Sequence, residues 1–290
     1  MLKKILLACF MVVVVASCNR DGKPEKSDAP AKDTAAAQLN DSVIHEIFNN
    51  KITPGFNETP ATAQQVLENA ILARFGKTGM ADIKTIYMEV RIKGGDMGAD
   101  SRVWMKMPDK LRTESTFGDK KGIAVYSQNN SWLKSPETDS VVSPSREEVM
   151  QMKIAAVSQI EYILSPISSL MKKPYSIDLA GKEMVDGREH YVIKFSNPEA
   201  KKQKAEAFDE HIVYIDAKTF LDSKIVTSVY IKGKTQMAVT QLSDNRKANG
   251  YLIAHKSITT QQNMKITTEV KSLNLNEPID DALFTKSSIK

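Results

Sequence analysis

Residues 85–93 read TIYMEVRIK, and every second side chain in this stretch is apolar. Successive side chains of a β-strand point to opposite faces, so the alternation predicts a strand with one apolar and one charged face. The same pattern recurs in residues 102–107, 224–232 and 264–266. We therefore expect an antiparallel sheet whose apolar side chains gather on one side.

Other short β segments lie between residues 83 and 135 and between residues 175 and 273, each bounded by Gly, Pro, Asp or Asn. Two segments have helical spacing instead: residues 60–75, which end at Gly76, and residues 145–172, which are interrupted at Pro166. The order predicts a mainly β (α+β) domain over residues 40–290. We expect about eleven strands in a strongly curved sheet, with the helix of residues 145–172 against its concave face.

The first residues have the three parts of a secretory signal. Lys3 and Lys4 precede an apolar run, residues 5–16, and the small Ser17. The run has 12 residues, whereas a helix needs about 20 to cross a membrane. We expect residues 1–17 to be a signal peptide that is removed.

The end of this signal, Val15-Ala16-Ser17-Cys18, resembles the lipobox of bacterial lipoproteins. The resemblance implies that Cys18 is lipidated and anchors the chain to a membrane, because several acyl chains hold a protein firmly. Residues 18–39 are rich in Ala, Lys and Asp, which predicts a disordered tether. The other cysteine, Cys9, would be lost with the signal, so no disulfide is expected.

Charge and motifs argue against several functions. The net charge is +5, or +3 without Lys3 and Lys4, and basic and acidic residues are interspersed. Nucleic-acid binding needs clustered basic residues, so this charge pattern argues against it. S-x-x-K, S-D-N and K-T-G occur, at residues 169, 243 and 77, but in the wrong order for a penicillin-recognising enzyme. The histidines form no metal motif. We expect no catalysis, no metal and no cofactor. The four histidines are His45, His190, His211 and His255.

Five further segments carry a family resemblance. In order along residues 62–284, they resemble segments of the LolA/LolB-type lipoprotein-sorting family. This resemblance implies an unclosed antiparallel β-barrel that is capped by helices and holds acyl chains. The segments are MPDKLR (107–112), YSQNNSW (126–132), LAGKEMVDG (179–187), IVYIDAKTFL (212–221) and LNEPIDDALF (275–284).

Two departures shape the expected function. Met107 stands where the family's soluble carrier has an Arg that latches the lid, and Cys18 predicts a tethered protein instead of a diffusing one. We expect a lipid-anchored protein, at the outer membrane facing the periplasm, that binds acyl chains of lipids or lipoproteins. The alternatives are an envelope regulatory or scaffold module that binds a protein partner, and a hydrolase with an unrecognised site. The expected cavity residues are Met88, Val90, Ile92, Val103, Met105, Ile160, Ile163, Val229 and Ile231.

Overall fold

The computed structural model describes residues 57–77, 79–95, 97–127, 130–137, 140–197, 207–231 and 234–289. In these residues the strands form one sheet of thirteen, paired antiparallel throughout, in the order β6-β5-β4-β3-β2-β1-β13-β12-β11-β10-β9-β8-β7. The strands are β1 (Thr85–Gly94), β2 (Met97–Lys106), β3 (Lys110–Phe117), β4 (Lys120–Ser127), β5 (Asn130–Lys134), β6 (Val141–Val142), β7 (Ser176–Val185), β8 (Arg188–Ser196), β9 (Ala207–Asp216), β10 (Asp222–Ile231), β11 (Lys234–Ala248), β12 (Tyr251–Gln261) and β13 (Met264–Leu275).

The helices start where the sequence supplies caps. Thr62 and Ser145 form capping boxes with Gln65 and Glu148, which satisfy backbone N–H groups that would otherwise lack partners. Pro166 occupies the first turn of the next helix, where its missing N–H is harmless. The helices are α3 (Ala63–Phe75), α4 (Arg146–Leu164) and α5 (Pro166–Met171), followed by the 3₁₀ turns η1 (Asp281–Phe284) and η2 (Lys286–Ser288).

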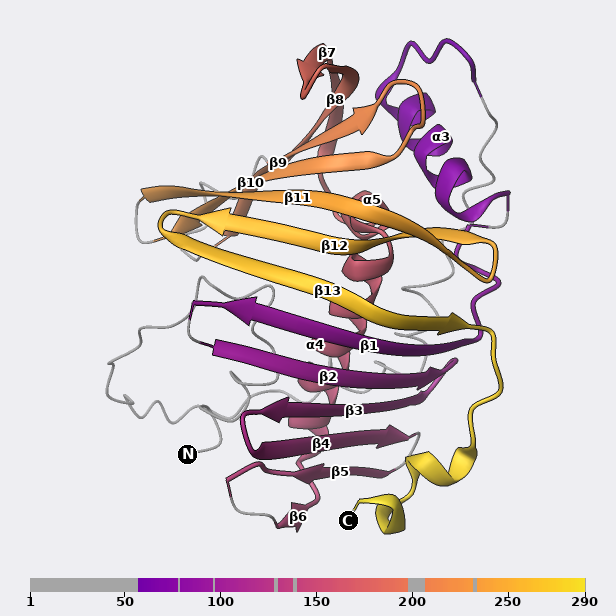
Figure 1. The fold of residues 1–290 in the computed structure, drawn as a ribbon, viewed down its shortest axis with the longest axis vertical. Helices are drawn as coiled ribbons and strands as arrows, with labels where there is room; N and C mark the ends of the chain where they lie inside the picture. The colour runs from indigo at the N-terminus through magenta and orange to yellow at the C-terminus, as the bar shows by residue number, and fades with distance from the viewer. Residues whose placement is uncertain are drawn as a thin grey trace, which may run out of the picture.

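The chain connection places α4 across the sheet. Strands β1 to β6 follow one another outward to one edge, whereas β7 to β13 run back from the opposite edge until β13 pairs with β1. Helices α4 and α5 are the segment between β6 and β7, so they must span from edge to edge. Figure 1 shows α4 running across the strands on one side of the sheet.

The main core lies between the sheet and these helices. It joins α3, α4 and α5 to the inward side chains of both halves of the sheet; Leu67, Val157 and Ile193 are among its fully buried members. The concave face is therefore the apolar face that the alternating pattern predicts.

A smaller core lies on the other face of β2 to β5. There the C-terminal segment packs Phe284 and Ile289 against Ile123 and Val125. Buried Arg112 holds this segment, because its guanidinium donates to the backbone oxygens of Leu283 (2.9 Å) and Ser288 (3.2 Å). Arg112 is the last residue of the first family-like segment, and here it fixes the C-terminus to the sheet.

The predicted fold class is confirmed: the protein is mainly β, with one unclosed antiparallel sheet and helices on its concave face. The number of strands is thirteen instead of about eleven, because β6 has only two residues and lacks a detectable pattern. Strand β11 extends to Ala248 through SDNRKA, a polar run typical of a turn, because β12 pairs with it along that length. Residues 1–56, which include Cys18, the expected tether and the start of the expected domain, lie outside the described part of the chain.

Candidate functional site

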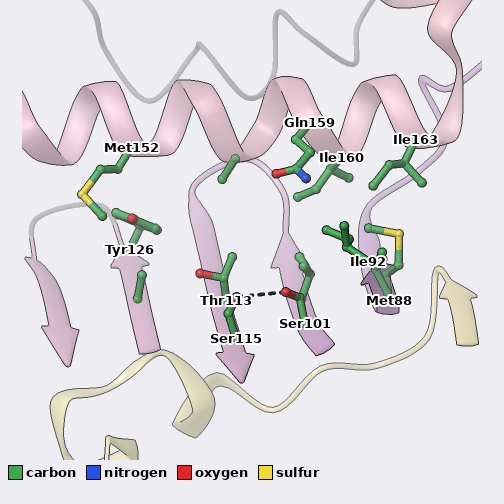
Figure 2. Close-up of a pocket in the computed structure, with 14 residues that line it drawn as sticks. Met88, Ile92, Ser101, Thr113, Ser115, Tyr126, Met152, Gln159, Ile160 and Ile163 are labelled. Carbon is green, nitrogen blue, oxygen red and sulfur yellow. Dashed lines mark hydrogen bonds between the residues drawn. The ribbon is translucent and has the colours of Figure 1, made fainter. Parts of the chain in front are cut away.

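A cavity of about 50 Å³ lies between α4 and the concave face of strands β1 to β4 (Figure 2). Ten of its lining side chains are apolar and four are polar. The lining residues are Met88, Val90, Ile92, Ser101, Val103, Thr113, Ser115, Ala124, Tyr126, Met152, Ala156, Gln159, Ile160 and Ile163.

The strand register arranges the floor of the cavity in rows that cross the four strands. The deepest row is entirely apolar apart from one tyrosine hydroxyl, and its residues are almost fully buried. The next two rows contain small or polar side chains, which leave the open space. From β1 to β4 the rows are Ile86-Met105-Leu111-Tyr126, then Met88-Val103-Thr113-Ala124, then Val90-Ser101-Ser115-Gly122.

The roof of the cavity is one face of α4. Met152, Ala156 and Ile160 recur at intervals of four residues, with Ile163 one turn further. This spacing places them on the same side of a helix. Figure 2 shows Met152 and Ile160 pointing from α4 toward the strands.

The polar lining residues lie near the middle of the cavity. Ser101 on β2 and Ser115 on β3 share a hydrogen bond of 2.9 Å between their hydroxyl oxygens. Thr113 lies beside them on β3, and Gln159 points toward them from α4 (Figure 2). No Lys, Arg, Asp or Glu lines the cavity, so it suits a neutral ligand.

Helix α4 is packed unevenly along its length. Of the described side chains in residues 146–155, only Met152 is buried, whereas five are buried in residues 156–164. A segment that makes few buried contacts opens at a low cost in free energy. The first half of α4 is therefore the more easily displaced half, and it covers the Met152 end of the cavity.

The second half of α4 is anchored by a buried ion pair. The carboxylate of Glu161 meets the ammonium of Lys172, just after α5. Burial raises the pKa of Glu161, against the opposing effect of Lys172. Burial likewise lowers the pKa of Lys172, against the effect of Glu161. Because removing one partner would leave a buried charge, this pair fixes α5 to the end of α4.

Six of the nine expected cavity residues line the cavity: Met88, Val90, Ile92, Val103, Ile160 and Ile163. Met105 does not, because it lies one row further along the strands, where it is fully buried. The side chains of Val229 and Ile231 lie outside the described part of the chain.

The cavity is small in this structure. Its volume is about 50 Å³, because Met152, Ala156 and Ile160 of α4 occupy space on this face of the sheet. Met264, which the alternating pattern of residues 264–266 assigns to the apolar face, is instead 37% exposed at the start of β13.

The sequence pattern misses the polar lining and the contribution of β3 and β4. The inward residues of β3 include Thr113 and Ser115, so its inner face does not read as apolar. On α4, Gln159 lies next to Ile160 and carries no distinguishing pattern. A signal does exist in the small inward residue Ala124, which favours space over packing.

A second hollow, of about 250 Å³, lies on the convex face between β1, β2 and the segment before η1. Tyr87 and Trp104 form its floor, with ring centroids 5.4 Å apart. Asn274, Glu277 and Asp280 make its rim polar. It is larger than the concave cavity but open and partly charged, so it is a poor site for an alkyl chain.

The remaining chemistry of the described residues gives no competing site. His190 and His255 bond their own strands through backbone oxygens at 3.0 Å, and no cluster of His, Cys, Asp or Glu with metal-binding geometry occurs in the ranges that the structure covers. Lys172 of the S-x-x-K sequence pairs with Glu161. None of the described helices is both long and apolar enough to cross a membrane.

Comparison with known proteins gives one family match by sequence. The model of a family described as "Uncharacterized protein" matches residues 118–290. The chain belongs to this family. The match covers β4 to the C-terminus, and therefore includes α4 and part of the cavity floor. No curated protein sequence matches the chain.

Solved structures similar to this family member have low sequence identity to it. A LolA superfamily protein from Nitrosomonas europaea is 14% identical with a TM-score of 0.49, over 79% of this chain and 100% of that one. A DUF1329 family protein from Desulfovibrio piger is 13% identical with a TM-score of 0.49, over 79% of this chain and 99% of that one. A putative outer membrane lipoprotein-sorting protein domain from Vibrio parahaemolyticus is 13% identical with a TM-score of 0.45, over 78% of this chain and 99% of that one.

Proposed function

We propose that this protein is a non-enzymatic, lipid-anchored envelope protein that binds acyl chains of lipids or lipoproteins between α4 and strands β1 to β4. Its role is in lipoprotein sorting or outer-membrane maintenance. The observation that carries the proposal is the apolar, uncharged cavity under a helix that is loosely packed at one end.

The composition of the lining favours an alkyl ligand. Val90, Val103 and Ile160 offer branched walls, while Met88 and Met152 add flexible thioethers that adapt to chains of different shape. Burial contributes about 0.8 kcal/mol per CH₂, so a 14-carbon chain gains on the order of 10 kcal/mol before ordering costs. This gain is large enough to displace a helix that few contacts hold.

Binding requires α4 to move. Ligand pockets measure about 300–1,000 Å³, and the cavity of about 50 Å³ is therefore a closed form. Lifting residues 146–155 would expose the middle rows of the floor, while the Glu161–Lys172 pair keeps the other end of α4 in place. In this mechanism α4 is a lid hinged near Ala156.

The expected lipid anchor determines where the protein encounters its ligand. Lipid on Cys18 would hold the protein at the outer membrane, facing the periplasm, and residues 18–39 would let the domain reach chains from that membrane or from passing lipoproteins. A flexible segment of about twenty residues spans some tens of ångströms. The membrane itself is then the first partner, and no nucleic acid is involved.

The test compares two neighbouring alanines of α4. Ala156 is 6% exposed and lines the cavity, whereas Ala155 is exposed and does not line it. Leucine suits a helix in both places, but at position 156 it occupies the space that the ligand needs. We expect Ala156→Leu to reduce bound acyl chains at least tenfold, measured by native mass spectrometry of the purified protein, and Ala155→Leu to leave them unchanged.

Melting temperatures of both variants separate loss of the cavity from loss of the fold. If the parent neither carries nor takes up acyl chains, or if the two variants bind them equally, the proposal is wrong. Recovery of a stoichiometric protein partner without lipid would favour the alternative, an envelope regulatory or scaffold module.

A further inference from the structure

Four polar side chains line a cavity that is otherwise apolar: Ser101, Thr113, Ser115 and Gln159. Interior polar groups without partners are costly, and native interiors contain few of them. A pocket that served only hydrocarbon would be better lined by Val or Ala at these positions. Their presence therefore requires a reason.

The hydrogen bonds among these residues leave donors unused. Ser101 and Ser115 each have one O–H, and their shared bond of 2.9 Å consumes only one of the two. Among the described residues, neither the Thr113 hydroxyl nor the Gln159 amide has a hydrogen-bond partner. One serine O–H, the threonine O–H and the amide N–H groups thus face the cavity.

These donors come from opposite sides of the same space. Figure 2 shows Gln159 reaching down from α4 while Thr113 and Ser101 point up from the strands. The next row along the strands, which includes Met105 and Leu111, is apolar and fully buried. A ligand with an alkyl chain toward this deep row would bring the atoms at its head to the level of the donors.

The charge of the lining selects among possible head groups. A neutral oxygen acceptor fits, since each donor can bond it. A carboxylate does not fit, because no Lys or Arg lines the cavity and an unpaired buried charge is far more costly than a neutral group. A plain alkane has no hydrogen-bond acceptor and would leave the donors unpaired.

We infer that the cavity selects acyl chains in ester or amide linkage, whose carbonyl oxygen accepts hydrogen bonds from Gln159, Thr113 and the Ser101–Ser115 pair. This inference rests on the proposed function and narrows it to acylated molecules, such as diacylglycerol lipids or N-acylated proteins, over free fatty acids and hydrocarbons.

The experiment measures three probes of equal chain length on the full chain: methyl tetradecanoate, tetradecane and sodium tetradecanoate at pH 8. Each is delivered from cyclodextrin, and binding is measured by equilibrium dialysis. We expect the ester to bind about tenfold more tightly than the other two, as two neutral hydrogen bonds would give.

A matched pair of variants assigns the effect to the donors. The double variant Thr113→Val with Gln159→Met keeps the shape but removes both donors, and should lower ester affinity about tenfold without weakening tetradecane binding. Thr116→Val is the control, because Thr116 is exposed on the same strand and should change nothing.

Each outcome has a distinct meaning. If no probe binds, the proposed function and this inference are both wrong. If the ester, the alkane and the carboxylate bind equally, or if the double variant weakens ester and alkane alike, acyl binding stands but carbonyl recognition is wrong.

Discussion

Arg74 on α3 and Asp222 on β10 lie 148 positions apart in the sequence and form a buried pair, with Nε donating to Oδ1 at 2.6 Å. Their side chains are 2% and 0% exposed. Arg74 also donates to the backbone oxygen of Leu252 at 2.9 Å. One guanidinium thus fixes α3, the first described helix, to β10 and β12, which come from the other half of the chain. Figure 1 shows α3 near the ends of these strands.

The first prediction concerns this pair. Arg74→Met leaves the Asp222 carboxylate and the Leu252 carbonyl buried without their partner, and we expect a loss of about 3–5 kcal/mol in the free energy of unfolding. Adding Asp222→Asn removes the unpaired charge and should restore part of the loss. Denaturant unfolding measures both. Equal stability of the single and double variants would mean that Asp222 is not a buried anion.

The second prediction concerns the stability of the fold at acidic pH. His211 lies on the concave side of β9, with Nδ1 3.0 Å from the Thr227 hydroxyl and Nε2 3.4 Å from that of Tyr175. Burial lowers the pKa of His211 from 6.5 to about 4. A lowered pKa contributes stability that is present above pH 6.5 and is lost as the pH falls toward 4.

At about 1.4 kcal/mol per pKa unit, this contribution is at most about 3.5 kcal/mol. We expect His211→Gln to make the unfolding free energy less dependent on pH between 6.5 and 4 than it is in the parent. The difference between the two pH curves isolates this residue from the carboxylates. Parallel curves would contradict the assignment.

The third prediction concerns the anchor expected at Cys18. Cys18→Ala removes the thiol that would carry the lipid, so the protein should move from the membrane fraction to the soluble envelope fraction or remain unprocessed. Fractionation and metabolic labelling with a fatty acid measure this. Unchanged fractionation together with unchanged labelling would refute the lipoprotein assignment.

The sequence predicts the architecture because alternation and capping are local. The pattern of residues 85–93 specifies β1, and Ser145, Glu148 and Pro166 specify where α4 and α5 begin. The extension of β11 through residues 243–248 is decided by its pairing with β12, which no local pattern contains. The same is true of the contact between Arg112 and the C-terminal segment.

The candidate site is only half predictable. Apolar residues such as Val90 and Ile160 are identified by their spacing, and they do lie around the cavity. Met105 belongs to the same face as Val103 but one row deeper, and only the register between strands separates a lining residue from a buried one. The size of the cavity depends on how closely α4 approaches the sheet, which is a property of packing and not of composition.

The central claim is that an acyl chain lies between α4 and strands β1 to β4. The most direct measurement is photocrosslinking with a 14-carbon acyl methyl ester that carries a diazirine at the end of its chain, followed by peptide mass spectrometry. The account predicts labels on the peptides that contain Met88, Val103 and Ile160, and loss of those labels in Ala156→Leu but not in Ala155→Leu. Labels confined to convex-face residues such as Tyr214 and Val226, or no labelling that excess unlabelled ester can compete away, would contradict it.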